Sequence, residues 1–211
     1  MSQRYFVTGT DSAVGKTVVS ALLCAALDAI YWKPIQAGTL EGTDRLTVQR
    51  LAGIGEEQTL PEAYTFAPPV SPHLGAKWAN VEIDVERLQI PAEAGNQSLV
   101  VEGTGGVLVP INNSDFMLDL IAKLKLPTIV VARSGLGTVN HTLLTLAALH
   151  SASAPVRGVV LIGEHNADNH ETIERYGHAK VVGEIPKLPF LNRSVLLRVF
   201  ETRFDRKALA G

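Results

Sequence analysis

The chain has 211 residues, of which 46% are hydrophobic and 19% charged; this composition favours one globular domain over 1–211 and excludes a largely disordered chain. Its 19 basic and 21 acidic residues give a formal net charge of −2, which argues against nucleic acid or an anionic membrane as a partner. The single cysteine, Cys24, excludes an intrachain disulfide, and no run is apolar enough for a signal peptide or a membrane span. We expect a cytoplasmic protein.

Apolar, β-branched segments alternate with helical patterns along the chain. This alternation predicts βαβ units and an α/β fold with a mostly parallel sheet. Runs such as LVV and TIVV are continuously apolar, which indicates strands covered by helices on both faces. We expect residues 53–95, which contain five prolines, to form an irregular excursion over one sheet edge. The expected strands are 5–9, 30–35, 98–103, 128–132, 156–162 and 181–185, and the expected helices are 17–29, 44–51, 116–123, 139–151 and 169–175.

The segment GTDSAVGKT, residues 9–17, follows the first expected strand and opens the first expected helix. In a phosphate-binding loop at this position, backbone N–H groups bind phosphate oxygens, Lys16 reaches the β and γ phosphates, and the Thr17 hydroxyl is a Mg²⁺ ligand. The usual spacing holds only if Thr10 replaces the first glycine, because Gly9 lies one residue too early. A glycine turn with a chance GKT is the alternative, and the strand–loop–helix context disfavours it.

A phosphate loop is usually completed by an acidic residue near the end of another buried strand, which holds the metal. Glu102 in LVVEGTGG is the candidate, and the glycines after it allow a ligand to approach the backbone. An ordinary turn carboxylate is the alternative. Asp44 in GTDRLTVQRL is a second candidate, although its position equally suits a carboxylate that only favours a helix start.

Two further segments are candidates for binding anions. Lys33 ends the segment IYWK and precedes Pro34, so its ammonium is expected at the carboxyl edge of the sheet, where ligands bind in open α/β folds. A solvated lysine at a strand end is the commoner situation. The segment SGLGTVNH, residues 134–141, follows a strand and opens a helix, which makes it either an anion site or a plain glycine turn.

Motifs in order over nearly the whole chain resemble those of the dethiobiotin synthetases. This resemblance implies a P-loop NTPase fold and a homodimer. It also implies an ATP- and Mg²⁺-dependent ligase that closes the ureido ring of dethiobiotin from 7,8-diaminononanoate and CO2. The motifs are VTGTDSAVGKT, YWKPIQAG, TDRLTVQRL, YTFAPPVSPH, LVVEGTGGVLVP, LPTIVVARSGLGTVNHTLLT and VVGEIPKLP.

The resemblance assigns roles to individual residues. It makes Lys16 and Lys33 the catalytic cations, and Thr17, Asp44 and Glu102 the metal ligands. The nucleotide would be bound by Ala13, Val14, Gly15, Lys16, Thr17, Val18, Glu102, Gly103, Thr104 and Gly105, with Pro186, Lys187 and Leu188 beside the base. The substrate would contact Lys33 and Ala37, and its carboxylate would meet Gly137, Thr138, Val139 and Asn140 of the second subunit.

The sequence departs from the family pattern at three points. Ala37 stands where many members carry a serine, so a hydroxyl contact to the substrate is absent. Some relatives read the adenine edge with an asparagine after the fifth strand, whereas this chain offers Asn166 a few residues later, which leaves the nucleotide base preference open. The connection LDAI before the second strand is short and lacks a glycine turn, so the first helix or the second strand is expected to be trimmed.

Without the resemblance, the residues indicate a Mg²⁺-dependent P-loop protein whose activity stays open among ligase, kinase and switch. A partition or nitrogenase-like switch ATPase normally carries an extra lysine early in the loop, and that region is TDSA here. A small-molecule kinase needs an Arg-rich lid, which is missing between Gly103 and Pro127. A ligase acting on cobyrinate would need an amidotransferase domain with a nucleophilic cysteine, which the chain lacks.

Overall fold

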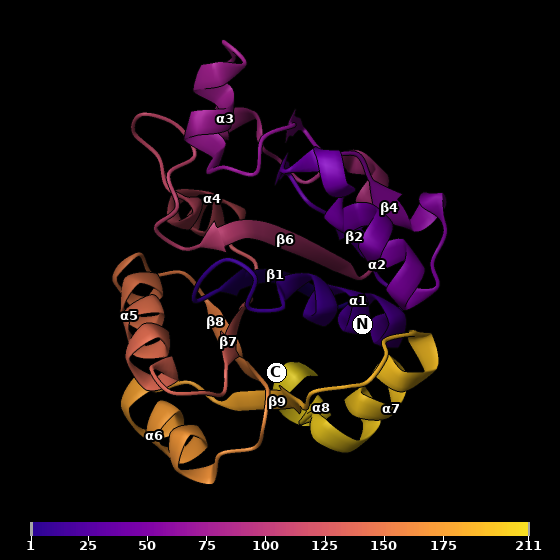
Figure 1. Ribbon diagram of the computed structural model, residues 1–211, viewed down its shortest axis with the longest axis vertical. Helices are drawn as coiled ribbons and strands as arrows, with labels where there is room; N and C mark the ends of the chain where they lie inside the picture. The colour runs from indigo at the N-terminus through magenta and orange to yellow at the C-terminus, as the bar shows by residue number, and fades with distance from the viewer. Residues whose placement is uncertain (1, 211) are drawn as a thin grey trace.

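The computed structural model, which describes residues 2–210, contains a seven-stranded parallel sheet (Figure 1). The strands are β1 (Arg4–Gly9), β2 (Ile30–Trp32), β4 (Thr59–Leu60), β6 (Leu99–Gly106), β7 (Thr128–Arg133), β8 (Val156–Ile162) and β9 (Val181–Ile185). Their order across the sheet is β4-β2-β6-β1-β7-β8-β9. Thus β6 lies between β2 and β1, which places three strand ends side by side. The α/β fold with a mostly parallel sheet is confirmed.

Helices cover both faces of this sheet. They are α1 (Lys16–Leu27), α2 (Asp44–Ala52), α3 (Pro72–Trp78), α4 (Met117–Leu124), α5 (Thr138–Ser151), α6 (Ala167–Gly177), α7 (Arg193–Arg203) and α8 (Arg206–Ala210). The two faces belong to separate hydrophobic clusters: Phe6 packs into one, and its neighbours Tyr5 and Val7 pack into the other. Side chains from α1, α2, α7 and α8 join the cluster of Tyr5, and those from α3 to α6 join that of Phe6. This two-sided burial explains the continuously apolar strands.

The second expected strand differs from the structure. Residues 30–35 do not form one strand, because Pro34 lacks an N–H group and cannot continue a central ladder. The chain leaves the main sheet after β2, and β3 (Ile35–Ala37) pairs with β5 (Tyr64–Phe66) in a separate two-stranded parallel sheet. The break turns Lys33 away from the strand ladder and toward the neighbouring strand β6.

The irregular excursion expected for residues 53–95 is wrong in part. This stretch contains β4 at the sheet edge, β5, α3 and three short 3-10 segments, η2 (Glu56–Gln58), η3 (Val85–Arg87) and η4 (Ala92–Ala94). A further 3-10 segment, η1 (Thr39–Glu41), precedes α2. Helices α7 and α8 were not expected either. The five expected helices are confirmed within three residues at each end.

The end of α1 shows how the short LDAI connection is made. Asp28 adopts a left-handed conformation with φ 49° and ψ 48° at the helix C-cap, and its N–H group donates to the carbonyl of Cys24. A glycine usually fills this position because a Cβ atom disfavours it, and aspartate is among the residues that tolerate it. The helix therefore stops at Leu27, two residues before the expected end, and β2 begins at once.

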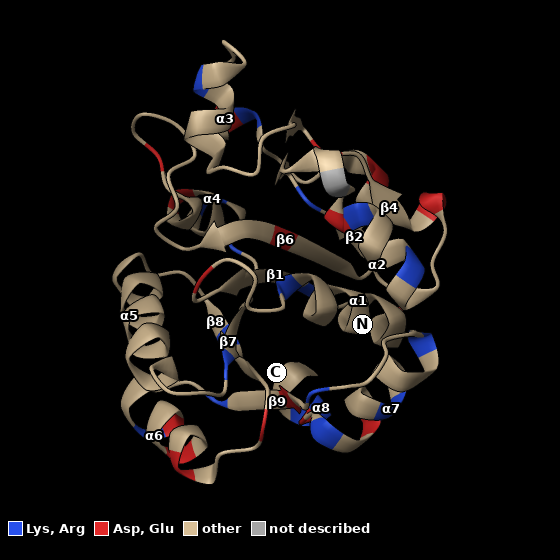
Figure 2. Cartoon of the chain, in the orientation of Figure 1, with Lys and Arg blue, Asp and Glu red and all other residues tan. Residues whose placement is uncertain are grey.

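Charged side chains are spread over several elements: Figure 2 shows basic residues on α2, α7 and α8 and acidic residues on α6. None of the helices described between residues 2 and 210 is long and apolar enough to cross a membrane.

Replacing Asn192 at the N-cap of α7 should destabilise the fold. Its side-chain oxygen accepts a hydrogen bond from the N–H group of Val195 at 3.0 Å. We expect Asn192→Ala to lower the free energy of unfolding by about 1 kcal/mol, because a helix N–H group loses its partner. Urea denaturation measures this change. Asn192→Asp keeps an acceptor and should retain the stability of the unsubstituted chain; equal losses in both variants would show that capping is not the cause.

Candidate active site

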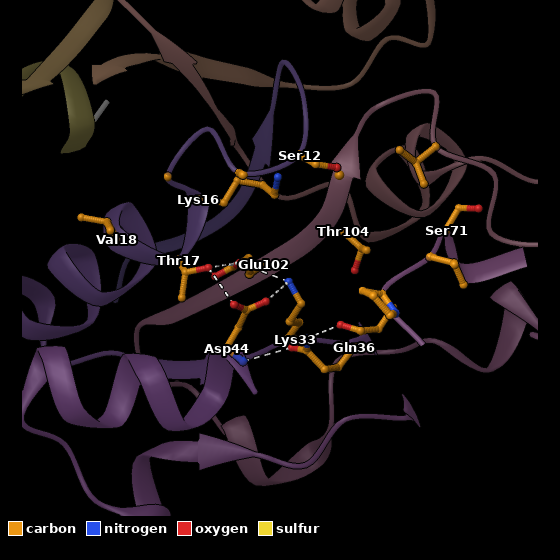
Figure 3. Close-up of a pocket in the computed structure, with 17 residues that line it drawn as sticks. Ser12, Lys16, Thr17, Val18, Lys33, Gln36, Asp44, Ser71, Glu102 and Thr104 are labelled. Carbon is orange, nitrogen blue, oxygen red and sulfur yellow. Dashed lines mark hydrogen bonds and ion pairs between the residues drawn. The ribbon is translucent and has the colours of Figure 1, made fainter. Parts of the chain in front are cut away.

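A cleft of about 500 Å³ lies at the carboxyl side of β1, β2 and β6, where the phosphate loop meets the start of α2 (Figure 3). The loop contributes side chains that follow β1, and Lys33 follows β2. Residues from β3, from α2, from the segment before α3, from β6 and from the segment after β6 complete the lining. The lining residues are Ser12, Ala13, Gly15, Lys16, Thr17, Val18, Lys33, Gln36, Ala37, Asp44, Pro69, Val70, Ser71, Glu102, Thr104, Gly105 and Val109.

The loop before α1 has the backbone of an anion-binding turn. Gly15 is the N-cap of α1 with φ 102°, and no side chain caps this helix end, which leaves the positive end of the helix dipole available to a ligand. This positive φ disfavours any residue with a Cβ atom, and a Cβ at position 15 would also meet the Ile162 side chain, so the turn favours glycine. Lys16 is buried, and its ammonium donates to the carbonyl of Asp11 at 2.9 Å.

Three oxygen-bearing side chains from distant parts of the chain converge beside this loop. The Oγ1 atom of Thr17 lies 3.0 Å from Oδ1 of Asp44 and 3.0 Å from Oε1 of Glu102. Thr17 is the second residue of α1, Asp44 is the first residue of α2, and Glu102 is on β6. Hard oxygen donors, including one or two carboxylates, are what Mg²⁺ prefers in proteins. The described residues, 2–210, contain no group of three or more His, Cys, Asp and Glu side chains placed for a metal.

Lys33 lies against the same two carboxylates. Its Nζ atom is 2.8 Å from Oδ2 of Asp44 and 3.1 Å from Oε1 of Glu102, and it also donates to the carbonyl of Gly103 at 3.3 Å. The side chain is only 3% exposed. The interpretation of Lys33 as a solvated strand-end lysine is therefore wrong, because the turn at Pro34 directs the ammonium into the cleft.

The charges in this cluster stabilise one another. Burial lowers the pKa of Lys33, but the carboxylates of Glu102 and Asp44 outweigh burial and hold this pKa above its usual value. Burial raises the pKa of Asp44, but the Lys33 ammonium, the Thr17 hydroxyl and the Lys16 charge together outweigh it, so the net shift is downward. Lys33 and Asp44 are therefore both charged at neutral pH.

Lys16 behaves differently from Lys33. Burial, and then the positive charge of Lys33, lower its pKa from 10.5 to about 8. The carboxylates that raise the pKa of Lys33 act on Lys16 too weakly to compensate. Lys16 therefore stays mostly charged at neutral pH, and an anion bound at the loop would raise this pKa again.

Two neighbouring residues that the sequence analysis missed support the carboxylates. The hydroxyl of Tyr31, fully buried, donates to Oε2 of Glu102 at 3.0 Å. Burial and the Glu102 charge raise the pKa of Tyr31, so the hydroxyl stays protonated. Gln36 accepts a hydrogen bond from the N–H group of Asp44 at 3.1 Å. In the sequence, Tyr31 is indistinguishable from a core residue in an apolar strand. Gln36 could have been identified, because it is a polar residue in the KPIQAG motif, two positions after Pro34.

Several candidate residues do not line this cleft. Val14 belongs to the loop, but its side chain is buried, and Gly103 contributes only the carbonyl that faces Lys33. Residues 137–140 begin α5, and residues 186–188 follow β9. The roles that the resemblance gives these two segments, beside a partner's substrate and beside the base, stay predictions.

Comparisons with known proteins place the chain among its relatives. A family model described as "AAA domain" matches residues 3–195. A protein of Bradyrhizobium sp. named ATP-dependent dethiobiotin synthetase is 47% identical over 210 residues and covers 100% of both chains. A Brucella melitensis protein of the same name is 46% identical over 211 residues, covering 100% of this chain and 99% of the relative.

Solved structures with a similar fold are more distant in sequence. A ParA family ATPase from Chlorobium tepidum matches with a TM-score of 0.55 at 11% identity, over 90% of this chain and 86% of that chain. A MinC:MinD cell division protein complex from Aquifex aeolicus matches with a TM-score of 0.55 at 16% identity, over 93% and 86% of the two chains. At these identities the likeness concerns the fold alone.

Proposed function

The chain belongs to the dethiobiotin synthetase family, and we propose that it converts 7,8-diaminononanoate, CO2 and ATP into dethiobiotin, ADP and phosphate. The convergence of Lys33, Asp44 and Glu102 beside the Thr17 hydroxyl and the phosphate loop is the observation that carries this proposal. Cations and anions in such a cluster suit a reaction in which a phosphoryl group passes from a triphosphate to a carbamate.

The donors in the cleft fit Mg²⁺ and the triphosphate of ATP. Thr17 supplies a hydroxyl, and Asp44 and Glu102 each place a carboxylate oxygen 3.0 Å from it; these three residues would hold the metal. The uncapped start of α1 suits phosphate oxygens, and residues 13–18 would bind the triphosphate. When bound, Mg²⁺ neutralises negative charge on the phosphates.

The two lysines act on the reacting groups. One substrate amine adds to CO2 and loses a proton, which forms a carbamate. A carbamate oxygen then attacks the γ-phosphorus with ADP leaving, and the second amine attacks the carbamoyl carbon of this mixed anhydride with phosphate leaving and a proton lost. Lys33 faces the carbamate, and Lys16 stabilises charge on the transferring phosphoryl group. Both amines belong to one molecule, so ring closure is effectively intramolecular.

The alternatives from other classes have less support. The likeness to ParA and MinD proteins is at 11–16% identity and concerns only the fold, so it does not favour a switch ATPase. A small-molecule kinase shares the phosphate loop but would leave the γ-phosphoryl group on an organic product. Relatives that match over their full length at 46–47% identity favour the ligase.

The products distinguish these activities. We expect Mg-ATP to yield ADP and free phosphate in proportion to the diamine consumed, with the carbon of labelled bicarbonate in the urea carbonyl. Mass spectrometry of the organic product measures this label, and a reaction without diamine is the control. A stable phosphorylated organic product, or ATP turnover without labelled urea, would contradict the ligase.

We also propose a two-fold homodimer in which residues 137–140 approach the partner's substrate. Leu136 is fully exposed beside this segment, and Leu144 and Leu108 are each more than half exposed around a hollow of about 260 Å³. Exposed leucines of this kind are typical of surfaces that a second subunit covers. Light scattering at assay concentration should give the mass of two chains; a fully active monomer would contradict the dimer.

Nucleotide binding should weaken as pH rises above 8. Free Lys16 has a pKa of about 8, and a bound phosphate favours its charged form, so binding above this pH takes up a proton. Without Mg²⁺, we expect affinity for ATP to fall by up to about tenfold per pH unit between pH 8 and 10. Calorimetry in buffers of different ionisation enthalpy measures both affinity and proton uptake. The Lys16→Met variant should bind ATP more weakly and take up no proton on binding. Proton uptake that persists in this variant would show that another group takes up the proton.

A further inference from the structure

Tyr31 and Glu102 lie on adjacent strands and on the same face of the sheet. Tyr31 of β2 is opposite Val100 of β6, and both side chains belong to the hydrophobic cluster that includes residues of α1 and α2. Glu102 follows Val100 by two residues, so the strand alternation directs it to the same side. The Tyr31 hydroxyl thus reaches Glu102 within the hydrophobic cluster, and Tyr31 does not line the cleft.

The two oxygens of Glu102 have separate partners. Oε1 accepts hydrogen bonds from the Thr17 hydroxyl at 3.0 Å and from the Lys33 ammonium at 3.1 Å. Oε2 accepts from the Tyr31 hydroxyl at 3.0 Å. Glu102 is only 1% exposed, so bulk water does not replace a lost partner. A buried carboxylate that loses one of its donors is free to rotate toward those that remain.

We propose that Tyr31 is a positioning residue: its hydroxyl fixes the rotation of the Glu102 carboxylate so that Oε1 faces Thr17 and a bound Mg²⁺. The inference deepens the proposed function, because it rests on Glu102 as a metal ligand. Groups that orient a metal ligand in this way commonly change metal affinity by about 10- to 100-fold when they are removed. Tyr31 itself touches neither substrate nor metal.

Tyr31→Phe removes the hydroxyl and keeps the ring. In enzyme saturated with a non-hydrolysable ATP analogue, we expect the Kd for Mg²⁺ to rise about 10-fold or more. The kcat at saturating Mg²⁺ should stay within about threefold, because metal at high concentration restores the carboxylate's orientation. Binding of the analogue without metal should not change, since Tyr31 does not reach the phosphate loop. Calorimetric titration of Mg²⁺ and steady-state kinetics provide these values.

Tyr5→Phe is a matched control. Tyr5 of β1 is opposite Val100 from the other side, packs in the same cluster and is 2% exposed. Its hydroxyl donates to the carbonyl of Leu209 at 2.7 Å, outside the cleft. We expect Tyr5→Phe to lower the melting temperature without changing Mg²⁺ affinity. If Tyr31→Phe likewise lowers only the melting temperature, its hydroxyl is merely structural and the inference is overturned.

A second measurement covers the case in which Tyr31→Phe does not fold. 3-Fluorotyrosine at position 31 keeps the hydroxyl, and its 19F resonance should shift when Mg²⁺ is added, whereas one at position 5 should not. An unchanged resonance at position 31 would overturn the inference. Failure of the unsubstituted enzyme to bind Mg²⁺ would instead overturn the metal assignment of the proposed function together with this one, so the two failures are distinguishable.

Discussion

Lys33→Met should lower kcat by about 10²- to 10³-fold while the Kd for ATP stays within about threefold. Removal of a preorganised charge aimed at a transition state has effects of this size. The buried ammonium of Lys33 faces the cleft beside Glu102 and Asp44, and Lys33 lies outside the phosphate loop that precedes α1. It therefore acts on the carbamate and the transferring phosphoryl group more than on bound nucleotide.

The same variant should bind Mg²⁺ at least as tightly as the unsubstituted enzyme. The Lys33 ammonium lies on the two carboxylates assigned to the metal, so it competes with a cation for them. Steady-state kinetics and calorimetric titration measure the two effects. Lys207→Met, which changes an exposed lysine on α8, is the control and should leave both values unchanged. An unchanged kcat in Lys33→Met would contradict the catalytic role.

Glu102→Gln should weaken Mg²⁺ binding by about 10- to 100-fold and lower kcat/KM at limiting Mg²⁺ by at least as much. The substitution keeps the side chain's shape but removes a negative charge that faces Thr17 and Lys33. An amide also has only one oxygen, so it cannot accept from Tyr31 and Thr17 with two separate oxygens as the carboxylate does. Loss of a charged ligand is expected to matter at least as much as loss of a group that orients it.

Glu62→Gln is the matched control for this substitution. Glu62 is also a largely buried carboxylate in an ion pair, with Arg45 at 3.3 Å, and it does not line the cleft. Its variant should lose stability without any change in the Kd for Mg²⁺. Equal Mg²⁺ affinity in Glu102→Gln and the unsubstituted enzyme would remove Glu102 from the metal site.

The sequence predicted the elements that have strong local patterns. Helix α1, which begins within the GKT motif, and the apolar central strands have such patterns, and the structure confirms these elements. The missed elements have weak local signals. Strand β4 has two residues, α3 begins at Pro72 within a proline-rich stretch, and three arginines spaced five positions apart in α7 obscure its apolar face. Their conformations depend on what they pack against, which a local pattern does not contain.

The candidate site was predicted in its parts but not in its arrangement. Spacing alone gave equal weight to two interpretations of Asp44, as a helix-start residue and as a metal ligand. It favoured the interpretation of Lys33 as a solvated lysine. The structure brings both into contact because the chain turns at Pro34 and because β6 lies beside β2. Tyr31 could not be singled out, since its role depends on a neighbour 71 positions away in the chain.

The position of β6 in the sheet also constrains how the chain is made. Strands β1 and β2 are synthesised first, yet each pairs with β6 and neither pairs with the other. Until residues 99–106 have left the ribosome, the nascent chain carries two apolar strands with exposed edges and no partner between them. Long-range parallel pairing of this kind is slow and leaves such edges open to association. We therefore expect nascent chains that stop before residue 99 to be captured by chaperones or to aggregate, and chains that extend past β7 to acquire protease resistance.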